Sequence, residues 1–193
     1  MTDTLKQLNH LWSRGCDFLQ APMAIMGGAM SWVSDSNLVS AISNGGGFGV
    51  IACGAMSSDL LDQEIKATRA KTSKPFGVNL ITLHPELMDL IQVCIRNRVS
   101  HVVLAGGVPS GAAIEALKEA GVKVLCFTPT LALGKRLIRA GVDALIIEGH
   151  EAGGHIGPVS TSVLAQEILP EITQVPVFVA GGIGRGESLL SYL

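Results

Sequence analysis

Short apolar runs alternate with amphipathic stretches along most of the chain. The runs are five or six residues long and contain many β-branched residues, which is typical of strands buried on both faces of a parallel sheet. The stretches between them repeat apolar residues at helical spacing, most clearly from Leu87 to Ile95. Seven strands are predicted in this way, at residues 18–23, 48–52, 76–81, 101–105, 122–127, 142–147 and 175–180.

Turn and capping residues separate these elements in a regular order. Ser34 or Asp35 and Ser57 or Ser58 stand where helix N-caps are expected, and Ala-Gly-Val occurs at both 120–122 and 140–142, where a helix stops and a strand begins. Strands that alternate with helices predict a parallel α/β fold, either a (β/α)₈ TIM-type barrel or a doubly wound open sheet. Met-Gly-Gly-Ala-Met at 26–30 does not fit the dinucleotide pattern G-x-G-x-x-G, so the barrel is favoured.

The length of the chain limits how much of a barrel it can form. A TIM barrel has eight strands and needs about 250 residues, whereas this sequence has 193 and ends inside its seventh predicted helix. We therefore expect one domain, residues 1–193, that is a barrel truncated after strand seven. Such a barrel has two unpaired strand edges, through which a homo-oligomer could assemble.

Composition narrows the classes of partner. Hydrophobic residues make up 48% of the chain and the net charge is −2, with no basic run. A large core is expected, and nucleic acid and membrane surfaces are poor candidate partners. The four cysteines are scattered, residues 1–11 lack the apolar segment of a signal peptide, and no run of about 18 apolar residues occurs. These features predict a cytoplasmic protein with free thiols that acts on a small-molecule substrate.

The segment 148–157, Glu-Gly-His-Glu-Ala-Gly-Gly-His-Ile-Gly, carries the densest chemistry. It follows a predicted strand, and parallel α/β folds place their active sites at the carboxyl ends of strands. Glycines at 153, 154 and 157 surround His155 and have no side chains to bury it, so its imidazole is a candidate catalytic donor to a nitro or carbonyl oxygen. His150 is a weaker candidate. The spacing of His150, Glu151 and His155 does not match H-E-x-x-H, so no metal site is predicted.

Two further strand ends carry candidate binding residues. Asn79 closes the third predicted strand, where its amide could contact a ligand or simply form a turn. Gly181 and Gly182 follow the seventh strand and precede a helix, where their backbone N–H groups could bind phosphate or form only a tight turn.

Several segments together resemble one family: 21–23 (Ala-Pro-Met), 45–49, 75–80 (Pro-Phe-Gly-Val-Asn-Leu), 148–157 and 179–183. They are similar to the flavin-dependent nitronate monooxygenase (formerly 2-nitropropane dioxygenase) family, which also contains enoyl-ACP reductase II. The resemblance implies a (β/α)₈ barrel that holds FMN, with a small C-terminal helical domain. The family's eighth strand, which holds the other half of the FMN phosphate, and that helical domain are absent from this sequence, so weak FMN binding is expected.

The resemblance also assigns roles to residues. His155 corresponds to the active-site histidine beside the flavin, and Asn79 to a flavin-contacting asparagine. The remaining predicted cofactor contacts are Pro22, Met23 and Ala24 beside the ring, Gly181 and Gly182 at the phosphate, and Glu148, Glu151, Gly153 and Gly154 in the wall. The segment between Pro22 and Trp32 is slightly longer than in well-known members, which affects the contacts expected there.

The implied activity is that of an FMN-dependent oxidoreductase, with nitronate oxidation by O₂ as the first expectation. The sequence Glu-Ala-Gly-Gly-His-Ile-Gly is closer to the form found in the reductases, so an enoyl-ACP reductase that uses NADH or another NAD(P)H donor remains an alternative function. A truncated, non-catalytic remnant is the alternative from a different class.

Overall fold

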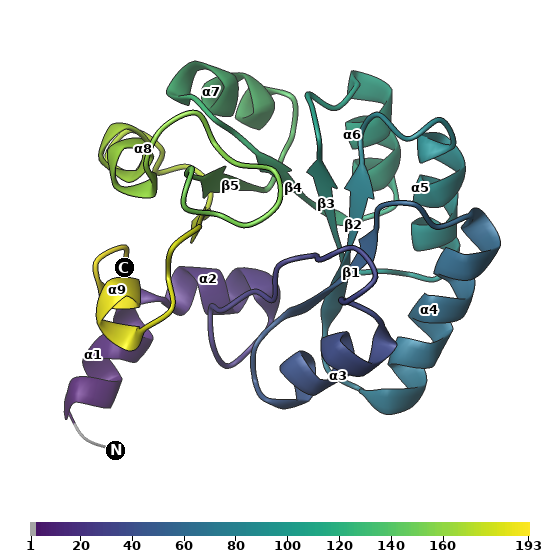
Figure 1. Ribbon diagram of the computed structural model, residues 1–193, viewed down its shortest axis with the longest axis horizontal. Helices are drawn as coiled ribbons and strands as arrows, with labels where there is room; N and C mark the ends of the chain where they lie inside the picture. Colours follow the sequence, from purple (N-terminus) through teal and green to yellow (C-terminus); the bar gives the residue numbers. More distant parts are fainter. Residues whose placement is uncertain (1–2) are drawn as a thin grey trace. The chain divides into compact units, whose positions relative to one another are not determined.

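The computed structural model describes residues 3–193, with side chains from Lys6 onward, and divides into two compact units. One unit is Trp12–Val124; the other combines Met1–Leu11 with Leu125–Leu193. The first unit contains α2 (Ser13–Leu19), α3 (Ser36–Asn44), β1 (Gly49–Cys53), α4 (Ser58–Lys71), β2 (Phe76–Ile81), α5 (Leu87–Arg96), β3 (His101–Ala105) and α6 (Gly111–Glu119) (Figure 1). The second contains α1 (Asp3–Leu11), α7 (Leu131–Arg139), β5 (Ala144–Glu148), α8 (Thr161–Ile168), β6 (Val177–Ala180) and α9 (Gly186–Leu190), and β4 (Lys123–Phe127) crosses the boundary.

The strands form a sheet in which spatial order follows sequence order, β1-β2-β3-β4-β5-β6. The registered pairs are parallel: Gly49 of β1 aligns with Phe76 of β2, and Leu145 of β5 aligns with Val177 of β6. A doubly wound sheet would reverse its strand order partway, and this sheet does not. The predicted fold class, a parallel α/β fold of the TIM-barrel type, is therefore confirmed.

The first predicted strand, residues 18–23, is wrong. Helix α2 runs through this segment to Leu19, and Gln20 ends it with a left-handed backbone at φ 54°. Extended pairing starts later: Met26 forms a parallel bridge with Phe48, supported by a 2.8 Å hydrogen bond from the Gly27 N–H to the Phe48 carbonyl. An apolar run this short fits a helix as well as a strand, and Leu19 is fully buried on the helix. Six strands, rather than seven, are therefore present in the described chain.

In the first unit the two faces of β1–β3 have different coverings. Helices α3 to α6 lie along one side of these strands (Figure 1), and on that side a Cβ at Gly49 would meet the Val39 backbone of α3. On the other face His101 is buried, with Nε2 2.8 Å from the Phe18 carbonyl oxygen and its ring edge-on to Phe18 and Phe48. Helix α2 therefore closes the amino-terminal half of this second face.

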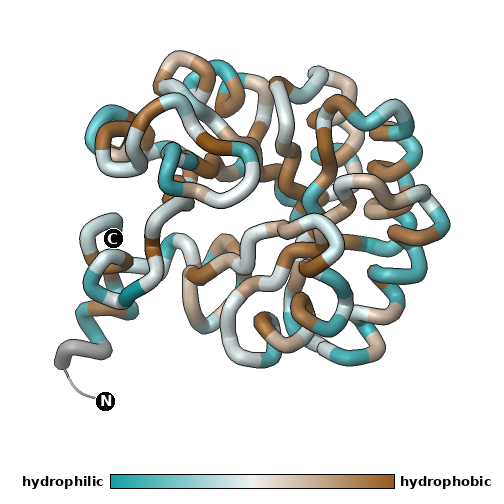
Figure 2. The backbone as a smooth tube through the Cα atoms, in the orientation of Figure 1, coloured by the Kyte–Doolittle hydropathy of each residue, from teal (hydrophilic) through white to brown (hydrophobic). Residues whose placement is uncertain are grey.

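Hydropathy follows the same division. Strands β1–β3 are hydrophobic along most of their length, whereas the turns of α4 and α5 alternate between hydrophobic and hydrophilic positions (Figure 2). This is the pattern of helices that bury one side on a sheet. Within residues 3–193 no helix is long and apolar enough to cross a membrane.

Three helix-to-strand turns share one hydrogen-bond pattern. At the predicted Ala-Gly-Val repeats, Gly121 and Gly141 have φ values of 75° and 97°, and the valine after each donates its N–H back to the helix. The turn after α5 repeats this geometry, with a 3.0 Å bond from the Val99 N–H to the Cys94 carbonyl, but Arg98 at φ 50° takes the place of the glycine. The left-handed conformation favours glycine, so Arg98 sits in a position that suits it poorly.

Candidate functional site

The glycine-rich loop predicted to carry the chemistry starts where β5 ends and folds back onto its own beginning. The Gly149 carbonyl accepts hydrogen bonds from the N–H groups of Ala152 and Gly157, both at 3.2 Å. The His150 N–H donates to the Val159 carbonyl at 2.9 Å. The loop is therefore closed by its backbone, and His155 projects from it with an exposed side chain.

The glycines of this loop have two different structural roles. A Cβ at Gly149 would collide with Thr161, and one at Gly157 would collide with the Glu148 carbonyl, so both positions require the absence of a side chain. A Cβ at Gly153 or Gly154 would meet nothing within 4 Å. Gly149 and Gly157 thus permit the fold of the loop, whereas Gly153 and Gly154 leave open space beside His155.

Glu151 anchors the loop to α8. Its carboxylate accepts hydrogen bonds from the Thr161 N–H at 2.8 Å and from the Thr161 hydroxyl at 2.9 Å. The bond from the Thr161 backbone is the main reason that the pKa of Glu151 lies below its usual value. Thr161 is buried, and its Oγ1 also lies 3.3 Å from the Gly181 carbonyl oxygen after β6. The sequence analysis did not identify Thr161 as a partner of Glu151.

Glu148 and His155 form the chemically most capable pair in the loop. Glu148 is half-buried at the end of β5, and burial raises the pKa of its carboxyl group, while the nearby charge of His155 acts in the opposite direction. A carboxyl group with a raised pKa beside an exposed imidazole can exchange a proton with it. The structure thus brings these two predicted residues together.

Gly181 and Gly182 begin a turn whose backbone donors are unused. Their φ values are 102° and 72°, and the N–H groups of residues 181–184 have no acceptor within the described residues. A Cβ at Gly181 would lie 3.0 Å from the Ala152 nitrogen, so this turn contacts the loop after β5. Consecutive free N–H groups and missing side chains fit an anionic phosphate, so this turn fits the phosphate end of FMN.

The first unit holds the other predicted residues. The Met23 N–H donates to the Gly46 carbonyl at 3.0 Å, and the Pro22 carbonyl accepts a 3.5 Å bond from the Cys16 thiol. Met23 and Ala24 are half-buried, and the Gly46 position is tight, since a Cβ there would lie 3.2 Å from the Met23 methyl carbon. The backbone at Pro22 to Ala24 is therefore held in place next to the segment that leads into β1.

Asn79 lies near the carboxyl end of β2, aligned with Ala52 of β1 and Val103 of β3. Its side chain is 8% exposed and forms no hydrogen bond within the described residues. The hydroxyl of Thr82, three residues later, is also buried without a partner there. A buried hydroxyl without a partner is costly unless a ligand or water pairs with it, so the Thr82 hydroxyl makes this strand end fit the polar edge of a bound ligand. Thr82 is a candidate that sequence reasoning missed.

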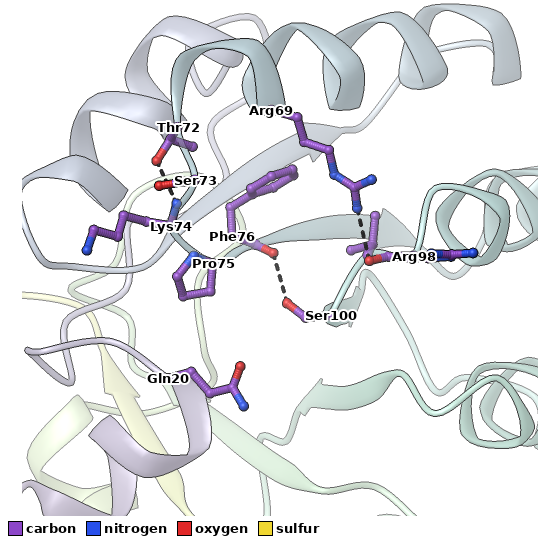
Figure 3. A pocket seen from close by; sticks show the side chains of 10 residues that line it. Gln20, Arg69, Thr72, Ser73, Lys74, Pro75, Phe76, Arg98 and Ser100 are labelled. Carbon is purple, nitrogen blue, oxygen red and sulfur yellow. Dashed lines mark hydrogen bonds between the residues drawn. The ribbon is translucent and has the colours of Figure 1, made fainter.

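A separate hollow lies at the opposite ends of the same strands. It has a volume of about 460 Å³ and includes Gln20, Arg69, Lys74, Phe76 and Ser100 in its lining (Figure 3). Its polar groups are partly used, because the Arg69 guanidinium donates to a backbone carbonyl at 3.0 Å and the Ser100 hydroxyl donates to the Phe76 carbonyl at 3.4 Å. The side chains of Lys74 and Arg98 extend to opposite sides of the view. No predicted site residue lines this hollow, so it is distinct from the candidate site.

The parallel strands in sequence order define a TIM-type α/β fold. The unused N–H donors after β6 and the glycine-rich loop with His155 after β5 form a candidate flavin site. The family model for nitronate monooxygenase matches residues 13–94 and 88–193. The chain therefore belongs to the nitronate monooxygenase family, and the resemblance inferred from the sequence is confirmed.

Individual relatives carry several names. FabK from Thermotoga maritima superposes with a TM-score of 0.89 and is 41% identical, covering 93% of this chain and 57% of that one. The (3aS,4S,5R,7aS)-5-hydroxy-7a-methyl-1-oxo-octahydro-1H-indene-4-carboxyl-CoA dehydrogenase of Mycobacterium tuberculosis is 38% identical over 85% of this chain and 46% of its own length. The nitronate monooxygenase of Paraburkholderia phytofirmans is 28% identical over 91% of this chain and 58% of its own length. The chain thus spans about half the length of the curated relatives it matches.

Proposed function

We propose that this chain provides the FMN-binding part of a flavin-dependent oxidoreductase. The observation that carries the proposal is the run of backbone N–H groups at residues 181–184, which lack acceptors within the described chain and follow a parallel strand. In this assignment residues 181–184 hold the phosphate. That Asn79 and the backbone at Pro22 to Ala24 contact the ring follows from the family resemblance alone. Bound FMN would supply the two-electron chemistry.

We further propose an acyl thioester of coenzyme A or acyl carrier protein as the substrate. The dehydrogenase from Mycobacterium tuberculosis, which is named for a CoA thioester, is more similar to this chain than the nitronate monooxygenase from Paraburkholderia phytofirmans. The sequence alone ranked nitronate oxidation first, whereas the similarity to these two relatives ranks a thioester substrate first. Nitronate oxidation remains the second candidate, because the family model that matches the chain bears that name. If the thioester reaction is a reduction, NADH or NADPH is the hydride donor.

The residues of the β5 loop would act in the same way on either substrate. His155 donates a hydrogen bond to the thioester carbonyl oxygen or to the nitro oxygen, where negative charge develops. Glu148 lies near His155 and has a raised pKa, so it is suited to orienting the imidazole and exchanging a proton with it. Gly153 and Gly154 leave space for the substrate beside the imidazole.

The test is an anaerobic flavin assay on the purified chain. FMN is titrated while flavin fluorescence is followed, and the loaded protein is then mixed with an acyl-CoA, with a nitronate or with NADH. We expect weak FMN binding, as the sequence predicts, so FMN is supplied in large excess, and we expect the acyl-CoA or NADH to bleach the bound fraction. Bleaching by nitronate alone would favour the second candidate, and an absence of FMN binding would overturn the flavin assignment. His155→Ala is the control: it should still bind FMN but should lose bleaching by substrate.

A further inference from the structure

Cationic side chains gather around the hollow at the amino-terminal ends of β2 and β3. Its described lining residues include Arg69, Lys74 and Arg98, and none of them is acidic. Among the described residues, none of these three cations is paired with a carboxylate. All of the lining residues belong to the unit Trp12–Val124, so the walls of the hollow are parts of one compact body.

Hydrogen bonds fix the two turns that form the walls. On one side, the Thr72 hydroxyl donates to the Asn44 amide oxygen at 2.6 Å and accepts from the Lys74 N–H at 3.0 Å. On the other side, the Arg69 guanidinium donates to the Arg98 carbonyl at 3.0 Å. Figure 3 shows Lys74 on one side of the hollow and the two arginines on the other. The backbone that carries the cations is therefore fixed on opposite walls.

Two residues of the hollow have backbone conformations that suit them poorly. Three non-glycine residues of the described chain have a positive φ, and two of them line the hollow, Gln20 at 54° and Arg98 at 50°. The equivalent turns after α6 and α7 have Gly121 and Gly141 at this position. The Arg98 side chain is exposed, so packing does not offset the strain. Strained residues cluster at ligand-binding sites, which favours a role for the Arg98 charge.

We propose that this hollow binds the phosphate group of a small phosphorylated molecule. Like charges repel one another, and an anion between the walls would turn that repulsion into attraction. Lysine and arginine bind phosphate through charge-assisted hydrogen bonds, and a doubly charged phosphate suits three cations better than a carboxylate does. The volume of about 460 Å³ lies within the range of about 300–1,000 Å³ found for small-molecule pockets, so there is room for an organic body as well. The site does not depend on the flavin assignment, because residues 181–184 belong to the other unit.

Amide NMR spectra of the labelled chain locate the anion during titration with inorganic phosphate, pyrophosphate or ADP. We expect shifts at residues 73, 74, 76 and 98–100, with affinity that falls as ionic strength rises. Adenosine, which lacks phosphate, should produce no shift. Equal affinity for phosphate and ADP would support the proposal with free phosphate as the ligand, and tighter binding of ADP would support it with a nucleotide. Shifts confined to residues 181–184, or no shift with any of the three anions, would overturn it.

Matched variants separate anion binding from folding. Arg98→Gly relieves the left-handed strain, so it should be at least as stable as the parent, yet its affinity for the anion should fall by about tenfold, as expected for one lost charge-assisted hydrogen bond. Arg98→Lys keeps the charge and should bind more tightly than Arg98→Gly, and Lys74→Gln should weaken binding from the opposite wall. Arg96→Gln is the control, because it removes an exposed arginine that does not line the hollow. Unchanged affinity in both Arg98→Gly and Lys74→Gln would overturn the proposal, as would an equal loss in Arg96→Gln.

Discussion

Replacing Gly157 with alanine tests whether the closed loop after β5 depends on its missing side chain. The new Cβ would collide with the Glu148 carbonyl oxygen and lie 2.8 Å from its carbonyl carbon, so it would meet rigid backbone. Forced overpacking of the closed loop costs about 1–3 kcal/mol. This strain lowers the ratio of closed to open loop by roughly 5- to 150-fold.

Amide hydrogen exchange measures that population directly. The N–H groups of His150, Ala152 and Gly157 are bonded only within the closed loop, so their protection should fall in Gly157→Ala by the same factor. The amides of β1–β3 belong to the other unit and should keep their protection. Substrate bleaching of the flavin should fall as well, because His155 is carried by the same loop.

Two alanine variants in the same loop serve as controls. Gly153 has open space and no left-handed backbone, so Gly153→Ala should leave exchange unchanged. Gly154 also has open space but a φ of 82°, so Gly154→Ala should cost about 1–2 kcal/mol from backbone strain alone. The expected order of damage is therefore Gly153, Gly154, Gly157. Equal protection in Gly157→Ala and Gly153→Ala would show that the loop does not close as described.

Three further predictions concern single residues. His155→Ala should reduce turnover about 10²–10³-fold without changing the melting temperature, since the side chain is exposed; equal turnover would remove His155 from the site. Burial raises the pKa of the Glu148 carboxyl above 4.5, its ordinary value, so the folded state loses stability as the pH rises from the unfolded-state pKa to the folded-state pKa. Glu148→Gln does not titrate, so it should be more stable than the parent only above the folded-state pKa. Melting temperatures of the two proteins that differ by the same amount at every pH would contradict this. Arg98→Gly should stabilise the protein by up to roughly 1 kcal/mol in chemical denaturation, because it gives the turn after α5 the glycine found at Gly121, and Gly121→Arg should show the reverse.

The sequence predicted the strands well where an apolar run was bounded by clear turn signals. Residues 76–81 and 101–105 coincide with β2 and β3, and the other strands differ by one or two residues at their ends. It failed at residues 18–23, because Phe18 and Leu19 are equally suited to a helix and a strand. The choice depends on His101, more than eighty residues later, whose imidazole lies against Phe18. The residues around 18–23 carry no information about a contact with residue 101, so their pattern alone cannot decide between helix and strand.

The sequence predicted where the candidate residues lie in the fold but not which groups they contact, and their roles in a site stay predictions. The β5 loop, the turn at Gly181 and Asn79 lie at or near the carboxyl ends of strands. Glu151, predicted in the wall of the flavin site, accepts hydrogen bonds from the N–H and the hydroxyl of Thr161 at the start of α8. Thr161 also lies beside the Gly181 carbonyl, so its role depends on residues on both sides of it in sequence. Such roles become visible only once α8 and β6 are placed against the loop.

The way these loops are held explains how one fold can serve several named activities. The loop after β5 closes through its own carbonyl at Gly149 and is anchored to α8 by Glu151, and the Trp32 loop closes through Ser34. Residues at the loop tips, such as Trp32 and His155, are exposed and can change without disturbing the strands beneath them. A change at an exposed tip residue such as His155 is therefore a more direct test of the proposed function than any measurement of the fold.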